Sequence, residues 1–378
     1  MKVLINAINS KCGGFKTITQ HIYNNLPEDN NEYYILVYKG SLNQEYKSNV
    51  KVIETRIGDS NYILRFFWYQ LIYPLYLLKS KYDISLNLSN YGPIIPVIPQ
   101  ILLLHNPKHV SQEIRKNYNW IKKLKAFIED FVLRISLIGT STLIVQTNFM
   151  KNGVVRKFNF NPNNIVVIPN IMPNIKENNL NKDLEIKIDE FIKNKKFLLG
   201  NITLYSEYKN LYLLVDAIEE ISKYNKNIGL IITISRTENE EAKRFIDYIE
   251  NKNLTNHILS VGNIKNTEVH YILSKVHAFA FPTYMESFGV PFVEAMQYSL
   301  PIIAADLEFA HNVCEKAAIY FDYTSKEQLI NCIEKLMNDN FLCQQMSEYS
   351  FNRYKELSSI DFVKEYVDLC TGMRGDLL

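Results

Sequence analysis

The chain has 378 residues, of which 47% are hydrophobic and 22% charged, a length and composition that predict two globular domains with substantial cores. The net charge of +2, without a long basic run, gives no reason to expect a nucleic acid partner. The five cysteines are scattered, odd in number and without metal-ligand spacing, so we expect reduced thiols and no metal site.

The N-terminal residues begin directly with a strand pattern, so we expect no signal peptide and a cytoplasmic location. Residues 62–78 are rich in aromatic and aliphatic side chains, but Arg65, Gln70 and Pro74 interrupt them. This stretch is too short and too interrupted to span a membrane. It is interpreted as a buried helix.

The first half of the chain alternates strand and helix patterns. A loop with Gly13 and Gly14 is predicted before a helix at 17–26, and a long helix is predicted at 113–137. The predicted strands lie at residues 2–7, 33–38, 50–55, 83–88, 99–104, 142–146 and 164–168. Repeated strand–helix units of this kind predict a doubly wound parallel sheet.

A polar segment at 171–189 is predicted to be a linker or an exposed stretch, and a second strand–helix series follows it. The sequence thus predicts domains at 1–171 and 172–360, with 361–378 as a C-terminal helix whose return to the first domain is left open. Both domains are expected to be of the α/β class.

Residues 280–306 form the most informative stretch, with the pattern strand, loop, helix, strand. Glu286 falls in the loop, Pro291 suits the first helical position, and Glu294 falls in the first helical turn. Ligands of open α/β sheets bind at this carboxyl edge. The two carboxylates can accept hydrogen bonds from a sugar and a ribose, or Glu294 caps its helix and Glu286 is a solvated loop residue. Their spacing alone does not decide between these interpretations.

The stretch from Glu286 to Glu294, with Phe281-Pro282 before it and residues 301–306 after it, resembles the Glu-x7-Glu signature of retaining glycosyltransferases of family 4. The continuation over 306–322 resembles members that build bacterial surface polysaccharides. The resemblance is strongest over residues 258–322, with weaker traces over most of the chain. It implies the GT-B fold, two Rossmann-like doubly wound domains that face each other across a cleft.

The resemblance also implies roles for residues of the second domain. Glu286 would hold the donor sugar, Glu294 the nucleotide ribose, and Lys209 would neutralise the leaving diphosphate, although taken alone Lys209 could be a surface lysine. The loop residues that would contact sugar and pyrophosphate, largely through backbone amides, are Ser287, Phe288, Gly289 and Val290.

Two positions depart from the family pattern. Many members carry an arginine about six residues before the lysine, and residues 200–206 contain none, so Arg236 or Asn201 is considered as its replacement. Ser299 stands where the family usually has glycine, at the end of the predicted helix.

In the first domain, His105 follows a strand and resembles the family's active-site histidine near the donor sugar and acceptor. A single histidine after an apolar run is otherwise more often structural. Gly13 and Gly14 match the position of the family's N-terminal glycine loop, although a simple turn explains the pair equally well. Thr147 and Asn170, at predicted strand ends, are weaker candidates.

These resemblances imply an enzyme that moves a hexose-type sugar from a nucleotide-diphosphate sugar to a glycan or lipid-linked oligosaccharide, with retention of configuration and without cofactor or metal. Its expected place is bacterial surface polysaccharide synthesis (capsule or O-antigen). The alternatives are a non-catalytic nucleotide-sugar-binding subunit and another GT-B enzyme such as a nucleotide-sugar epimerase.

Residues 115–125 contain five basic side chains and Trp120. They could hold the protein on the anionic inner face of the cell membrane, or form a solvated basic face of a core helix. Both interpretations stay open on the sequence.

Overall fold

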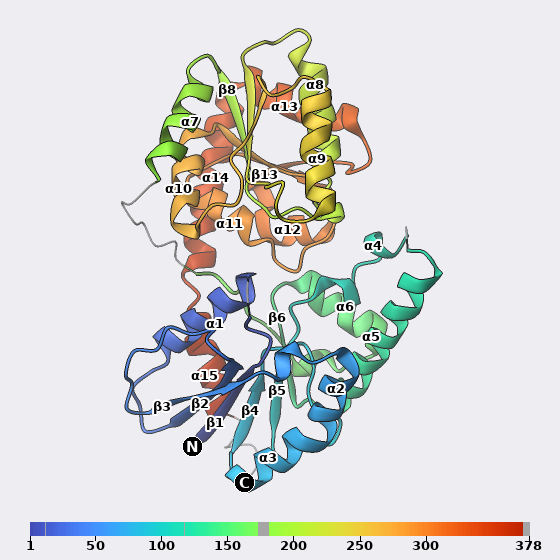
Figure 1. The fold of residues 1–378 in the computed structure, drawn as a ribbon, viewed down its shortest axis with the longest axis vertical. Coiled ribbons are helices and arrows are strands. Elements are labelled where there is room, and N and C mark those ends of the chain that lie inside the picture. The colour runs from blue at the N-terminus through green and yellow to red at the C-terminus, as the bar shows by residue number, and fades with distance from the viewer. Residues whose placement is uncertain (12, 117, 173–180, 373–378) are drawn as a thin grey trace. The chain divides into compact units, whose positions relative to one another are not determined.

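The computed structural model describes residues 1–11, 13–116, 118–172 and 181–372 (Figure 1). The chain divides into two compact units. Unit 1 comprises Met1–Met172 together with Ile360–Leu378, and unit 2 comprises Pro173–Ser359.

Unit 1 is built on a seven-stranded parallel sheet with the order β3-β2-β1-β4-β5-β6-β7. Its strands are β1 (Lys2–Ala7), β2 (Glu32–Tyr38), β3 (Val50–Thr55), β4 (Ile84–Asn87), β5 (Gln100–Leu103), β6 (Thr142–Val145) and β7 (Ile165–Val167). Its helices are α1 (Gly13–Asn25), α2 (Tyr62–Phe67), α3 (Tyr73–Ser80), α4 (Glu113–Lys116), α5 (Trp120–Ile138), α6 (Asn148–Phe158) and α15 (Phe362–Gly372).

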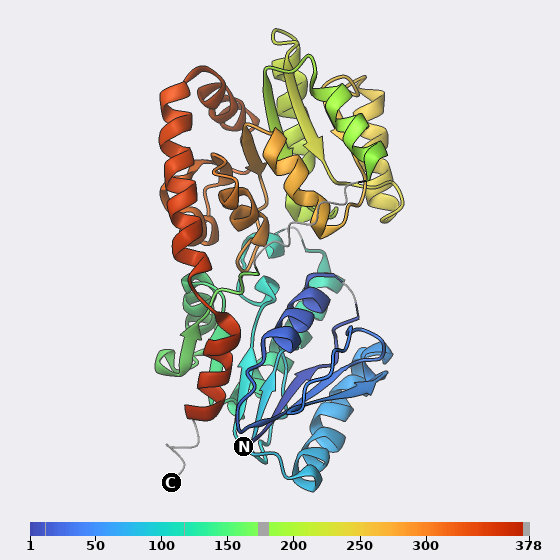
Figure 2. The ribbon, with the colours of Figure 1, turned by 90° about the vertical axis from the view of Figure 1, so that its left-hand side faces the viewer.

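The C-terminal helix α15 follows unit 2 in the sequence but belongs to the core of unit 1 (Figure 2). Its buried side chains, among them Phe362 and Val363, pack in one cluster with residues of α1, β1 and β4. The Tyr366 hydroxyl donates a hydrogen bond to Asn170 Oδ1 at 2.6 Å. This helix therefore covers one face of the sheet beside α1.

Unit 2 has a six-stranded parallel sheet with the order β10-β9-β8-β11-β12-β13. Its strands are β8 (Phe197–Asn201), β9 (Ile228–Ile232), β10 (Ile258–Ser260), β11 (Ala278–Phe281), β12 (Ile302–Ala305) and β13 (Ala318–Phe321). Its helices are α7 (Lys182–Ile192), α8 (Leu211–Ser222), α9 (Glu240–Asn251), α10 (Asn266–Lys275), α11 (Val290–Gln297), α12 (Glu308–Cys314), α13 (Lys326–Asn338) and α14 (Asn340–Ser358).

Each sheet reverses its strand order once, between β1 and β4 in unit 1 and between β8 and β11 in unit 2. This is the doubly wound arrangement, in which ligands bind beyond the carboxyl ends of the strands at the switch point. All four residues of β11 and of β12 are buried, as expected for strands covered by helices on both faces. The predicted α/β class with two doubly wound domains is confirmed.

Four local predictions are wrong, and one of them is the linker or exposed stretch at 171–189, because α7 begins at Lys182 and buries Leu184 and Ile188. The Gly13-Gly14 pair does not lie in a loop, because α1 already begins at Gly13. The predicted helix at 113–137 is interrupted between α4 and α5, since the Asn119 side chain accepts a hydrogen bond from the Lys122 N–H and starts a new helix.

The last of these errors concerns residues 62–78, predicted to form a buried helix. They form α2 and α3, joined by a π-helical turn over Trp68–Ile72, and only one side is buried, through Tyr69, Tyr73 and Leu77. The other side is exposed and also apolar. In the parts of the chain that the structure describes, no helix is both long enough and apolar enough to cross a membrane.

Candidate functional site

The loop at residues 282–289 leaves the sheet of unit 2 at its switch point. It connects β11 to α11, and β8 lies next to β11. The backbone N–H of Tyr284 donates to the carbonyl of Tyr208 at 2.9 Å, which fastens this loop to the connection that follows β8. Two connections far apart in sequence therefore meet at one edge of the sheet.

That contact brings Lys209 and Glu286 together. Lys209 Nζ lies 2.5 Å from Glu286 Oε1, and the two side chains are only 11% and 16% exposed. The ammonium group also lies 4.7 Å from the centre of the Phe281 ring. The Thr283 hydroxyl lies 3.3 Å from the same Glu286 oxygen. Lys209 is thus an ion-paired and largely buried group, not an ordinary surface lysine.

Glu294 lies in α11, one helical turn from its start, with a partly exposed side chain. Burial raises the pKa of its carboxyl group to about 7. A carboxyl group held in this way gains from a ligand that donates hydrogen bonds, such as a vicinal diol, because the donors stabilise its ionised form.

Gly289 precedes α11 with a left-handed backbone, φ +78°. A Cβ atom at this position would lie 2.7 Å from Cδ2 of Phe292, so a side chain does not fit without movement. The neighbouring Phe288 side chain is buried, which leaves its backbone as the part available to a ligand. Ser287 and Val290 are partly exposed on either side. The N–H groups at a helix start favour anions, although in α11 Pro291 has none and that of Phe292 donates to the Gly289 carbonyl.

Asn201 ends β8 and is buried. Its Nδ2 donates to the carbonyl of Ala280 at 2.7 Å, while its Oδ1 has no hydrogen-bond partner among the described residues. Arg236 is held instead by Asp247 and Glu250 of α9, each at 2.5 Å. Of the two residues considered as replacements for the absent arginine, Asn201 therefore lies at the switch point and Arg236 is engaged by α9.

The Ser299 departure has a local explanation. Its φ of +57° is left-handed, a conformation that glycine adopts most easily. The Leu300 N–H donates to the Ala295 carbonyl and closes the end of α11. The serine thus affects the turn after α11.

In unit 1, His105 follows β5 and stacks on Phe15, with ring centres 5.3 Å apart. Asn90 Oδ1 accepts hydrogen bonds from the backbone N–H groups of His105 and Asn106, so its Nδ2 faces His105 Nε2 at 3.3 Å as a donor. Nε2 is then the acceptor and Nδ1 carries the proton, and Nδ1 is buried without a hydrogen-bond partner among the described residues.

Burial, with a smaller contribution from His109, lowers the pKa of His105 to about 4. The imidazole is therefore neutral near pH 7, with an unused N–H donor. Such a group can bind or orient a polar ligand without contributing charge.

The other candidates of unit 1 have structural roles or stand open to solvent. Thr147 starts α6 by accepting a hydrogen bond from the Met150 N–H, and Asn170 accepts one from Tyr366. Gly13 and Gly14 are the first residues of α1, and a Cβ atom on Gly14 would meet no atom within 4 Å.

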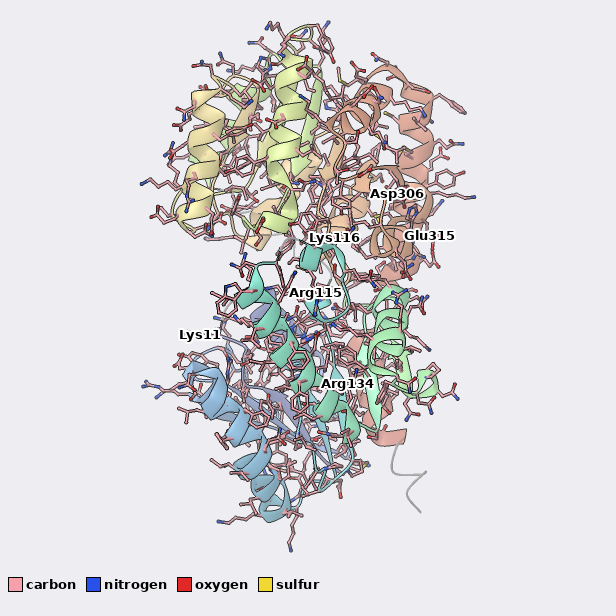
Figure 3. The ribbon with its side chains drawn as sticks, turned by 90° about the vertical axis from the view of Figure 1, so that its right-hand side faces the viewer. Lys11, Arg115, Lys116, Arg134, Asp306 and Glu315 are labelled. Carbon is pink, nitrogen blue, oxygen red and sulfur yellow. The ribbon has the colours of Figure 1, made fainter. Side chains whose placement is uncertain are left out.

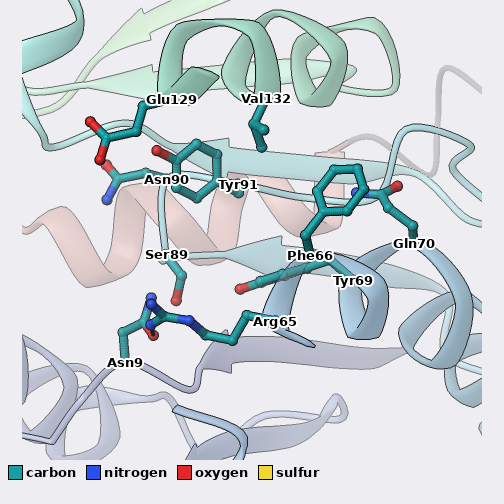
Figure 4. A pocket seen from close by; sticks show the side chains of 10 residues that line it. All are labelled: Asn9, Arg65, Phe66, Tyr69, Gln70, Ser89, Asn90, Tyr91, Glu129 and Val132. Atoms are coloured by element: carbon teal, nitrogen blue, oxygen red, sulfur yellow. Dashed lines mark hydrogen bonds between the residues drawn. The ribbon is translucent and has the colours of Figure 1, made fainter. Parts of the chain in front are cut away.

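A cavity of about 220 Å³ lies at the switch point of unit 1 (Figure 4). Arg65 Nη1 donates to Asn9 Oδ1 at 3.0 Å, and Ser89 Oγ is buried without a hydrogen-bond partner in the described residues. The lining residues are Asn9, Arg65, Phe66, Tyr69, Gln70, Ser89, Asn90, Tyr91, Glu129 and Val132. Because Asn90 also binds His105, the cavity and the histidine share a wall.

Sequence reasoning missed this cavity. A detectable signal was present, since Asn9 follows β1 and Ser89 and Asn90 follow β4, the two strands at the switch point. The contribution of Arg65 was not detectable, because it comes from α2 on a different part of the chain.

The fold and these strand-end loops define a GT-B protein made of two Rossmann-like units. Residues 182–353, which lie within unit 2, match the family model described as glycosyl transferases group 1. The O-antigen chain mannosyltransferase RfbU of Salmonella typhimurium is 23% identical over 261 residues, 68% of this chain and 69% of RfbU. These matches support a GT-B glycosyltransferase.

Solved structures show the same fold. Sucrose-phosphate synthase from Thermosynechococcus elongatus superimposes with a TM-score of 0.77 at 14% identity, over the whole of both chains. HepE of Anabaena in complex with UDP superimposes with a TM-score of 0.72 at 14% identity, over 99% of this chain and 100% of HepE. The GT-B fold expected from the resemblance is confirmed.

Proposed function

We propose that the protein is a retaining glycosyltransferase that moves a hexose-type sugar from a nucleotide-diphosphate sugar to a glycan or lipid-linked glycan. The observation that carries the proposal is the largely buried Lys209–Glu286 pair at the switch point of unit 2, next to the start of α11. The relationship to an O-antigen mannosyltransferase supports a role in bacterial surface polysaccharide synthesis, and we place it in the cytoplasm.

The donor binds to unit 2 in this proposal. Glu286 accepts hydrogen bonds from sugar hydroxyls, and Glu294 accepts them from the ribose diol. The backbone from Ser287 to Val290 contacts the diphosphate and sugar, and Asn201 Oδ1 offers an additional acceptor at the same strand edge. The complex of HepE with UDP supports a nucleotide-diphosphate ligand for this fold.

Transfer requires stabilisation of the negative charge that develops on the leaving diphosphate. The ammonium group of Lys209 and the positive end of the α11 dipole supply positive charge at this point. The proposal therefore assigns this role to the protein and requires no metal ion or cofactor. The acceptor hydroxyl attacks the anomeric carbon from the face that the diphosphate leaves, so the anomeric configuration is retained. The departing diphosphate accepts the proton of this hydroxyl.

The acceptor binds to unit 1. The cavity lined by Arg65, Asn9 and Ser89 offers hydrogen-bonding groups for sugar hydroxyls. The neutral His105, with its unpaired Nδ1–H, and the open start of α1 at Gly13 and Gly14 lie in the same unit.

The test is a panel of UDP, GDP and dTDP sugars incubated with the full chain, with released nucleoside diphosphate and sugar measured. We expect release from at least one donor, and NMR of the first-formed product should show the anomeric configuration of the donor. Inverted product would overturn the retaining assignment. Tight nucleotide binding without release from any donor would identify a non-catalytic nucleotide-sugar-binding subunit, the alternative favoured by the absent arginine in residues 200–206.

A further inference from the structure

Unit 1 exposes large hydrophobic side chains on two helical segments. Among the described residues, 22 large hydrophobic side chains are exposed. Six of these lie within residues 64–78, seven lie on α5, and Ile95 adds one more. Fourteen of the 22 therefore come from three short parts of a single unit, a concentration that is unusual for a surface facing only water.

Helix α5 has two apolar faces. One contains Val132, Leu133 and Leu137 and is buried. The other follows the spacing of three and four residues that keeps side chains on one side of a helix. Its exposed members are Trp120, Ile121, Leu124, Phe127, Ile128, Phe131 and Ile138, of which Trp120 is 74% and Phe127 68% exposed.

The segment from α2 to α3 repeats this arrangement. Tyr69, Tyr73 and Leu77 point into the core at intervals of four residues. The opposite side carries the exposed residues Leu64, Phe67, Leu71, Ile72, Leu75 and Leu78.

The two segments are neighbours. Phe66 and Tyr69 line the cavity of unit 1 on one side, and Glu129 and Val132 of α5 line it on the other (Figure 4). Figure 3 views this side of unit 1, with α2 and α3 in blue and α5 in teal. We name the exposed residues of these two segments the apolar face.

The charge around the apolar face is positive. The exposed charged residues of the two segments are Lys79, Lys122, Lys123, Lys125 and Arg134, with no aspartate or glutamate among the exposed positions that the structure describes there. The acidic Glu129 and Asp130 are partly buried, and Asp130 pairs with Arg115 and Lys157. Within the predicted basic segment 115–125, Arg115 is paired with Asp130 and Lys116 with Glu113. The positive charge that this segment offers to a partner is therefore smaller than its sequence suggests.

We propose that the apolar face binds an anionic lipid bilayer, with α5 and the α2–α3 segment lying in the plane of the membrane. Apolar side chains enter the region below the head groups, and the lysines contact lipid phosphates, as in other interfacial helices. Pairing this face with a second copy around a two-fold axis would instead place like charges opposite each other. The proposal goes beyond the transfer reaction and does not depend on it.

Vesicle co-sedimentation of the full chain tests the proposal, with phosphatidylcholine vesicles that contain or lack about 30% phosphatidylglycerol. The variants Phe127→Ser/Phe131→Ser and Leu71→Ser/Leu75→Ser should each lower the partition coefficient by about tenfold or more. The matched control is Phe341→Ser/Phe351→Ser on α14 of unit 2, where Phe341 is 76% exposed, and it should leave the coefficient within about twofold.

The basic contribution is tested separately. Lys122→Glu/Lys123→Glu should weaken binding to the anionic vesicles by about tenfold and leave binding to neutral vesicles unchanged. Equal loss on both kinds of vesicle would contradict the role of the lysines.

Fluorescence locates the contact. Because the chain has only two tryptophans, Trp68→Phe leaves Trp120 as the single reporter. Its emission should shift to shorter wavelength on anionic vesicles and be quenched by brominated lipids. The proposal is overturned if vesicles do not bind the protein. It is also overturned if light scattering shows a dimer that does not bind vesicles and that the substitutions in the apolar face dissociate.

Discussion

The two units share a strand order and differ in what they place at its switch point. Unit 2 gathers charged groups there, with Lys209 bonded to Glu286 and Glu294 nearby on α11. Unit 1 places the neutral His105 and Asn90 beside a cavity whose charged lining residues are Arg65, which is bonded to Asn9, and Glu129. The topology thus sets where a ligand binds, and the loops set which chemistry is available.

Their surfaces differ as well. The exposed large hydrophobic side chains of unit 2 are spread over several elements, for example Leu204, Tyr224 and Phe341. Those of unit 1 are concentrated on the apolar face. These differences agree with our proposals, which place the diphosphate chemistry in unit 2 and the acceptor and membrane contacts in unit 1.

The largest effect that we expect to separate the two units is the loss of activity when a charged group of unit 2 is removed. Lys209→Ala should lower transfer or donor hydrolysis by about 10²–10³-fold, because it removes the ammonium group assigned to the leaving diphosphate. It also leaves Glu286 without its ion-pair partner. Steady-state kinetics of the variant, with the exposed Lys226→Ala as control, measures the effect. Unchanged turnover would remove Lys209 from the reaction.

Glycine at the two helix starts should respond differently. Gly289→Ala must adopt a left-handed backbone and place Cβ against Phe292, so we expect unit 2 to lose about 1–3 kcal/mol of stability. Gly14→Ala meets open space in α1 and should be neutral or stabilising by up to about 1 kcal/mol. Urea denaturation of both variants checks the difference, and equal stability changes would contradict it.

The two units should also respond oppositely to pH. The pKa of His105 is lowered from 6.5 to about 4, so the stability that its neutral form contributes to unit 1 is lost as the pH falls through this interval. The pKa of Glu294 is raised from 4.5 to about 7, so its contribution to unit 2 is present below pH 4.5 and lost as the pH rises through 7.

Each effect should amount to about 3 kcal/mol, and hydrogen exchange resolved for the two units measures them. Glu294→Gln should abolish the loss of stability of unit 2 at higher pH and leave the pH dependence of unit 1 unchanged. The assignment fails if this variant shows the same pH dependence in unit 2 as the wild type.

The smallest effects distinguish the two arginine replacements. Asn201→Ala removes the hydrogen bond to the Ala280 carbonyl and should destabilise unit 2 by about 1–2 kcal/mol while weakening donor binding. Arg236→Ala removes only contacts with α9, so catalysis should stay within about twofold. Kinetics that show a greater loss for Arg236→Ala would reverse the choice.

The part of the fold that could be predicted rests on buried strands and strong local signals. The fully apolar β11 and β12, with the Glu-x7-Glu stretch between them, were visible as a strand–loop–helix–strand pattern. The meeting of Lys209 with Glu286 was not visible, because it depends on the hydrogen bond between Tyr284 and Tyr208 across two distant connections. The resemblance supplied that residue pair.

Other features escaped the sequence for physical reasons. An apolar run does not show which of two apolar faces is buried, so the exposed side of the α2–α3 segment was missed. The orientation of His105 depends on Asn90, which lies on another loop and has no local pattern in common with it. The break between α4 and α5 depends on a single capping side chain, Asn119.

The central claim is that Glu286 holds the sugar of a nucleotide-diphosphate donor in unit 2. The most direct measurement compares diphosphate release by the wild type and Glu286→Gln on the same donor, with Glu240→Gln, an exposed carboxylate at the start of α9, as the matched control. The account predicts a loss of about two orders of magnitude or more for Glu286→Gln, with an unchanged fold by circular dichroism and a control like the wild type. Wild-type release by Glu286→Gln would contradict it.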